Sequence, residues 1–112
     1  MRIEQLVTAY SELPMDRQIA FLAQFASVIT VSGWGTYDPE SLEVREPTKL
    51  RAFNEVQHEI LNLLRELLAS GQARYSAADF WSGVFHRADL GGASGDVRWA
   101  AEFAFSKMTV SD

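Results

Sequence analysis

The stretch from residue 19 to residue 31, IAFLAQFASVITV, is apolar on nearly every side of a helix. Only Gln24, Ser27 and Thr30 interrupt it, at intervals of three residues. A helix of this kind needs neighbours on most of its surface. Thirteen residues rise only about 20 Å, which is too short to cross a bilayer. The stretch therefore predicts a helix at the centre of a folded domain.

Helical spacing of apolar residues recurs along the rest of the chain. It predicts four further helices, near 2–13, 50–68, 77–88 and 97–108, with the central helix running from about 16 to 31. A chain of 112 residues with 47% apolar content can bury one core. We therefore expect a single all-α domain over 1–112, a compact bundle of about five helices.

Capping residues mark several of the expected helix ends. Thr48 is placed to cap the third helix, and Gly71 is placed to end it. Ser76 followed by Asp79 resembles a capping box for the fourth helix. Asp96 is placed to cap the last helix, after a glycine-rich connection.

The longest stretch without helical periodicity is 33–48, GWGTYDPESLEVREPT. It exceeds the usual length of about 2–8 residues for a connection between helices. Trp34 and Tyr37 lie in it beside two glycines. These aromatic side chains either hold the connection against the core or form a contact patch for a partner.

The third helix carries a polar cluster in an apolar pattern. Its apolar arc takes up about half the circumference and comprises Leu50, Phe53, Val56, Ile60, Leu61, Leu63, Leu64, Leu67 and Leu68. Gln57 falls inside this arc, Asn54 on its edge, and His58 just beyond the edge. A buried amide without a partner costs about 1–3 kcal/mol, so Gln57 should have a hydrogen-bond partner.

Three roles for Gln57 follow from its position. It can tie the third helix to a backbone group of the 33–48 connection, with Asn54 and His58 completing the network. It can form a polar contact at a homodimer interface, where a single buried polar residue fixes the register. It can also belong to a ligand or catalytic site.

Residues 50–68, LRAFNEVQHEILNLLRELL, resemble a segment of small uncharacterised bacterial all-helical proteins. The shared pattern is Leu50, Asn54–Glu55, Gln57–His58 and Ile60, with Arg74–Tyr75 before the next helix. The resemblance covers about a third of the chain. It implies an α-helical bacterial protein and carries no catalytic residue.

Composition and motifs exclude several classes of function. The net charge of −5 disfavours a nucleic-acid binder, and the absence of cysteine fits a cytoplasmic protein without thiolate metal sites. The spacing of Glu55 and His58 matches one half of a di-iron motif, but no second copy exists. We therefore expect no metal, no cofactor and no membrane attachment.

A possible catalytic triad on the fourth helix also lacks its context. Ser82, His86 and Asp89 share one face of this helix. The serine lacks a sharp glycine turn to present it, and amides within a helix are already bonded. These side chains are typical of a solvated helix face.

The last helix spreads Trp99, Phe103 and Phe105 around its circumference. Such a helix either docks deeply or is covered by a second subunit. We therefore expect a non-enzymatic protein–protein interaction module, a homodimer that presents residues 33–48 and the exposed edge of the third helix to a protein partner. The alternative is a small-molecule binder or enzyme, with Asn54, Gln57 and His58 as polar groups and Trp34 and Tyr37 as walls.

Overall fold

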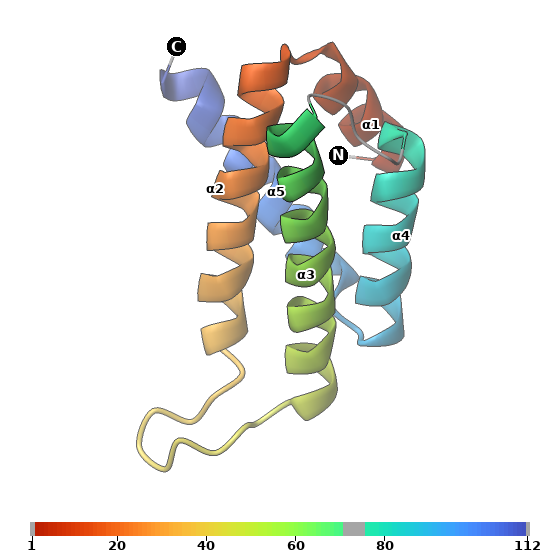
Figure 1. Ribbon diagram of the computed structural model, residues 1–112. Helices are drawn as coiled ribbons and strands as arrows, with labels where there is room; N and C mark the ends of the chain where they lie inside the picture. Colours follow the sequence, from red (N-terminus) through yellow and green to blue (C-terminus); the bar gives the residue numbers. More distant parts are fainter. Residues whose placement is uncertain (1, 71–75, 112) are drawn as a thin grey trace.

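The computed structural model in Figure 1 describes residues 2–70 and 76–111, including their side chains except those of Trp34, Ser70 and 109–111. Within these ranges the chain forms five helices and no strand, which confirms the predicted all-α bundle. The helices are α1 (Ile3–Glu12), α2 (Met15–Trp34), α3 (Pro47–Ser70), α4 (Ala77–Leu90) and α5 (Ser94–Ser111). The expected stop at Gly71 and the Arg74–Tyr75 pair lie outside the described residues.

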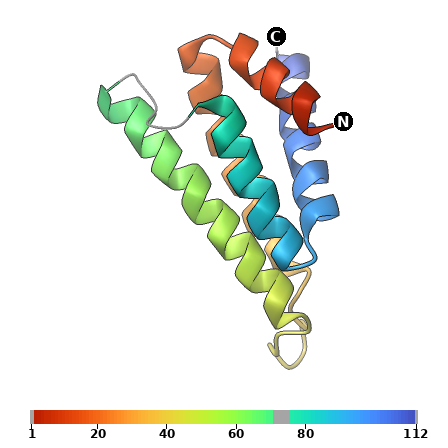
Figure 2. The same cartoon turned by 90° about the vertical axis from the view of Figure 1, so that its right-hand side faces the viewer.

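The helices pack into an elongated bundle of 43 × 28 × 28 Å. Helices α2 and α3 run antiparallel, side by side, and the segment 35–46 joins them at one end of the bundle (Figure 1). Helix α1 and both termini lie at the opposite end (Figure 2). Helix α2 packs most extensively against α3 and next against α5, while α4 packs against α3 and α1.

The core is a cluster of aromatic rings around Trp81 of α4, whose side chain is fully buried. Its ring centroid lies 5.8 Å from that of Phe21 and 5.5 Å from that of Phe25, both on α2. Tyr10 of α1 approaches Trp81 edge-on at 6.1 Å, and Phe105 of α5 stacks on Phe21 at 4.2 Å. Rings from four helices thus meet at α2, as expected for the apolar central helix.

One side of α2 stays exposed, although its pattern predicted neighbours on almost every side. This side carries the small residues Ala20, Ala23, Ser27 and Thr30, and toward the C-terminal end of α2 also Val31, which is 68% exposed. Small side chains present little apolar surface to water, so their exposure is tolerated. Two of the three polar interruptions in the apolar stretch therefore lie on the solvent side of α2.

Of the predicted helix caps, Ser76 is confirmed, because its hydroxyl accepts a hydrogen bond of 3.2 Å from the Asp79 amide. The caps at Thr48 and Asp96 are wrong. Helix α3 begins at Pro47, a residue suited to a first turn, so Thr48 lies inside that turn. Helix α5 begins at Ser94, which places Asp96 in its first turn.

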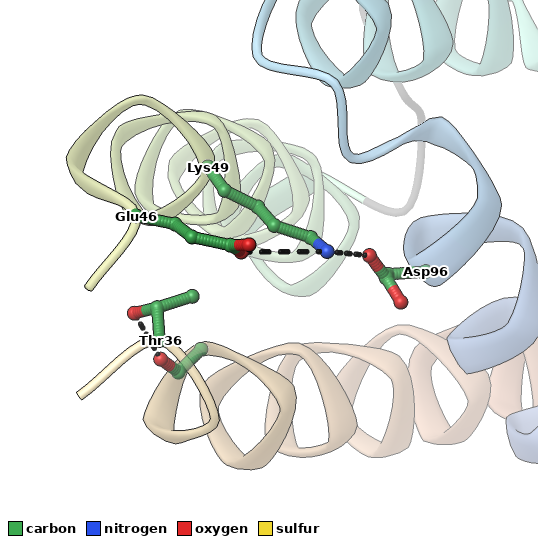
Figure 3. A network of polar contacts seen from close by, with 5 residues as sticks. Thr36, Glu46, Lys49 and Asp96 are labelled. Atoms are coloured by element: carbon green, nitrogen blue, oxygen red, sulfur yellow. Dashed lines mark hydrogen bonds and ion pairs between the residues drawn. The ribbon is translucent and has the colours of Figure 1, made fainter. Parts of the chain in front are cut away.

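The Asp96 carboxylate instead forms an ion pair with the ammonium of Lys49, at 2.6 Å (Figure 3). Lys49 also lies 3.6 Å from Glu46. The hydrogen bond with Asp96 is the main cause that raises the pKa of Lys49. Because these side chains are partly exposed, the pairs add little to stability, but they link the start of α3 to α5.

Helix α2 also ends later than its sequence predicted. Its expected end was near residue 31, but it continues to Trp34 and is capped at Gly35. Buried Thr36 accounts for this end, because its amide (3.1 Å) and its hydroxyl (2.7 Å) both donate to the carbonyl of Gly33 (Figure 3). The connection to α3 is therefore 35–46, shorter than the predicted 33–48.

Candidate functional site

The connection between α2 and α3 is an ordered hairpin. Tyr37 and Val44 form an antiparallel bridge. On the side of the bridge toward the helices, the amide of Arg45 donates to the carbonyl of Thr36 at 2.5 Å. On the side toward the tip, the amide of Asp38 donates to the carbonyl of Glu43 at 2.8 Å. We call residues 36–45 the hairpin. Backbone bonds thus fix a segment that has no helical periodicity.

The Asp38 carboxylate holds the tip of the hairpin together. One of its oxygens accepts hydrogen bonds from the amides of Glu40 at 2.9 Å and Ser41 at 3.4 Å. The carbonyl of Asp38 accepts a further bond from the amide of Leu42 at 2.8 Å. Asp38 therefore uses its charge and its backbone within the turn, as aspartate commonly does.

A cleft of about 770 Å³ lies between the hairpin, the C-terminal part of α2 and the N-terminal half of α3. Small-molecule sites typically enclose about 300–1,000 Å³ and combine apolar walls with a few polar groups. The cleft is lined by Ile29, Thr30, Gly33, Gly35, Tyr37, Asp38, Pro39, Leu42, Arg45, Leu50, Phe53, Asn54 and Gln57. Most of its lining is apolar.

Gln57 closes the cleft at the end away from the hairpin. Its amide nitrogen donates to the hydroxyl of Thr30 and, at 3.4 Å, to the carbonyl of Ala26. Thr30 donates its own proton to that same carbonyl at 3.0 Å. The expectation that Gln57 has a polar partner is confirmed. The first of its three possible roles, a tie to the 33–48 connection, is wrong, because both acceptors lie on α2.

The reason for this correction is the register between α2 and α3. This register brings Thr30, on the exposed side of α2, opposite Gln57, about one turn before α2 ends. The amide is satisfied there and does not reach the hairpin. The sequence showed a polar residue on each of the two helices. It did not show the register that places these two residues opposite each other.

The structure separates the five residues predicted for the site. Tyr37, Asn54 and Gln57 line the cleft. His58 is exposed and faces a separate shallow hollow beside Glu59 and Arg87. Trp34 is the last residue of α2, and its side chain lies outside the described part of the structure.

The hairpin residues that line the cleft, chiefly Pro39, Leu42 and Arg45, were not predicted from the sequence. Their side chains follow no helical pattern, so periodicity gave no sign of them. The one available indication was Asp38–Pro39, which is typical of a turn. A turn at that point reverses the connection, which then leads back to the start of α3.

Two polar groups of the cleft have no partner of their own. Within 2–70 and 76–111, no protein group bonds the side-chain amide of Asn54, and no carboxylate pairs with the Arg45 guanidinium. Asparagine both donates and accepts hydrogen bonds, and arginine donates several. The cleft can therefore bind a mostly apolar molecule that bears one or two hydrogen-bonding groups.

Two other kinds of site are absent from the described ranges. No group of three or more acidic or histidine side chains there is arranged to hold a metal ion. No helix in those ranges has both the length and the apolar character needed to cross a bilayer. Ser82, His86 and Asp89 are all exposed, as expected for a solvated face of α4.

Helix α5 exposes two of its aromatic rings. Its buried face is built from the small side chains Ala100, Ala101 and Ala104. Trp99 and Phe103 stack on each other at 5.2 Å and are 55% and 37% exposed. The helix therefore docks by one face and leaves an aromatic pair facing outward.

Comparison with protein-family models, with curated proteins and with solved structures finds no match to this chain. The fold and the cleft define the class to which the structure belongs, a small five-helix bundle with one hairpin-covered cleft in its described part.

Proposed function

We propose that this protein binds a small, largely apolar molecule in the cleft between α2, α3 and the hairpin. The observation that carries the proposal is the cleft itself, about 770 Å³ of mostly apolar lining that contains three of the five residues predicted from the sequence. Two exposed polar side chains of the cleft, Asn54 and Arg45, would fix the orientation of the ligand. The proposal involves no chemical step.

Cleft geometry favours a small ligand over an extended chain. The hydrogen bonds of Gln57 with Thr30 and Ala26 join α2 to α3 at one end. The hairpin joins the same two helices at the other end. An occupant must fit between these two links, which suits a compact molecule. We place this activity in the cytoplasm, as the cysteine-free sequence suggests.

Occlusion of the cleft tests the proposal. The probe is the apolar dye anilinonaphthalene sulfonate, whose fluorescence rises on apolar surfaces. Asn54→Phe places a ring at the mouth of the cleft, and Arg65→Phe places the same ring on an exposed part of α3 outside it. We expect Asn54→Phe to weaken dye binding by about tenfold or more, and Arg65→Phe to leave it unchanged.

The dye can also bind the exposed rings of α5, so the titration includes a Trp99→Ser variant. The proposal predicts that this variant keeps most of the saturable binding. Equal binding by Asn54→Phe and the parent protein would rule out the cleft as the site.

A second candidate function, self-association, is favoured by the exposed pair Trp99 and Phe103. Aromatic side chains on one helix face are typical of the central part of a protein interface. We propose that two copies of the chain pair through these faces of α5. The lysine ammonium of Lys107, 5.2 Å above the Phe103 ring, would then lie at the rim of the interface.

Sedimentation equilibrium tests this second candidate. We expect a dimer mass at high micromolar concentration and a monomer mass for Trp99→Ser. A monomer mass for the parent protein across that range would exclude the homodimer and leave the ligand-binding proposal intact.

A further inference from the structure

Leu42, near the tip of the hairpin, has an unfavourable backbone conformation. Its φ is +61°, and among the described residues other than glycine no other φ is positive. In this region the Cβ atom of an L-residue crowds its own backbone, so glycine and asparagine are preferred there. A branched residue such as leucine is rarely found in this conformation.

The surrounding hydrogen bonds impose this conformation. The amide of Leu42 bonds to the carbonyl of Asp38 at 2.8 Å, and Glu43 accepts from the amide of Asp38 at 2.8 Å. A single turn bonded in this way ends in a left-handed residue, as a helix C-terminus often does. The turn therefore requires the left-handed conformation and does not require leucine.

Packing in the free protein does not account for leucine either. The side chain of Leu42 is 76% exposed, yet it lines the cleft beside Pro39 and Arg45. It contributes almost nothing to the core. Strained residues that persist without a structural benefit are typical of ligand clamps.

We propose that Leu42 is a specificity-determining residue, an apolar lip that closes over the ligand in the cleft. This inference rests on the proposed function and adds that the ligand presents an apolar face to the hairpin. Contact with such a face would bury the side chain of Leu42. Because burial removes its apolar surface from water, this contact would stabilise the complex with the ligand.

Four variants test the inference by dye titration and thermal unfolding. Leu42→Gly and Leu42→Asn both suit the left-handed conformation and remove the apolar lip. We expect both to raise the Tm by a few degrees and to weaken dye binding by about fivefold or more. Leu42→Met keeps an apolar side chain, so affinity should stay within about twofold of the parent.

Leu90→Ala is the matched control, because Leu90 is an exposed leucine (72%) that does not line the cleft. It should leave dye affinity unchanged. If Leu42→Gly binds the dye as the parent does while Asn54→Phe does not, the lip is wrong and the ligand-binding proposal stands. If neither change affects binding, both are wrong. A lower Tm for Leu42→Gly would overturn the lip as well, since the backbone would then not be strained.

Discussion

Gln57 and Thr30 form the polar link that holds α2 and α3 together beside the cleft. The amide nitrogen of Gln57 is the donor, and both of its acceptors lie on α2. The hydroxyl of Thr30 already donates its proton to the carbonyl of Ala26. It could donate to residue 57 only by losing that bond. The link therefore requires a donor at position 57.

Replacement of that donor by an acceptor gives a direct prediction. Gln57→Glu keeps the shape of the side chain but turns a carboxylate toward two oxygen atoms. We expect the free energy of unfolding to fall by about 1–3 kcal/mol at neutral pH, as measured by urea denaturation. Asn54→Asp makes the same chemical change at an exposed residue of α3 and should shift it by less than about 0.5 kcal/mol. Equal effects of the two changes would show that the link is not formed.

Tyr10 predicts how stability depends on alkaline pH. Burial in the aromatic core raises the pKa of Tyr10 from 10.0 to about 12. The folded protein therefore favours the neutral form of the Tyr10 side chain. The resulting contribution to stability is fully present below pH 10 and is lost as the pH rises toward 12. We expect the free energy of unfolding to fall by up to about 1.4 kcal/mol per pH unit in that window.

Urea denaturation between these pH values measures the effect, and Tyr10→Phe should remove most of the decline. Tyr37→Phe changes a tyrosine outside the aromatic core and serves as the control. A decline that persists unchanged in Tyr10→Phe would contradict this assignment.

At the scale of elements, the approach of α4 to α3 depends on Gly91. A Cβ atom at Gly91 would lie 2.3 Å from that of Ala52 and 3.0 Å from the carbonyl oxygen of Thr48. Both contacts are with rigid parts of α3, so a methyl group would push the two helices apart. Glycine is needed here for close packing and not for an unusual φ.

We therefore predict that Gly91→Ala destabilises the protein by about 1–3 kcal/mol. Gly95→Ala is the matched control, because a Cβ atom there meets no neighbour within 4 Å. It lies in the first turn of α5 and should be neutral or slightly stabilising. Thermal unfolding of both variants decides the matter, and a Tm for Gly91→Ala equal to that of the control would contradict the close approach.

Element types were predictable from the sequence, because helical spacing of apolar residues depends only on local geometry. The first residue of each helix was harder to predict from the sequence. Thr48 and Asp96 have good capping chemistry, but Pro47 can begin α3 one residue earlier, and Lys49 recruits Asp96 across the bundle. Tertiary partners of this kind cannot be seen from a single segment.

The cleft was predictable only in part, and for the same reason. Asn54 and Gln57 stood out because they interrupt an apolar arc on one helix. Leu42 and Arg45 belong to the cleft only because the hairpin folds back, which depends on backbone hydrogen bonds across the hairpin that helical periodicity cannot reveal. His58 shares a motif with Gln57 but turns away from the cleft by about 100°, the angle between adjacent helical residues.

At the scale of the whole molecule, the bundle has two distinct regions. Near the chain termini, rings from α1, α2, α4 and α5 form the aromatic core. Toward the hairpin, the cleft lies between α2 and α3, and its lining combines buried Ile29 and Phe53 with the polar Thr30 and Gln57. This division lets a well-packed core support an open site, as binding sites on rigid scaffolds require.

An amide NMR titration of isotope-labelled protein with anilinonaphthalene sulfonate tests the central claim, that the cleft is a ligand site. We predict saturable shifts for residues along the cleft, within 29–45 and 50–57, and little change in 97–107 of α5. Shifts confined to 97–107, or the absence of saturable shifts along the cleft, would contradict the claim.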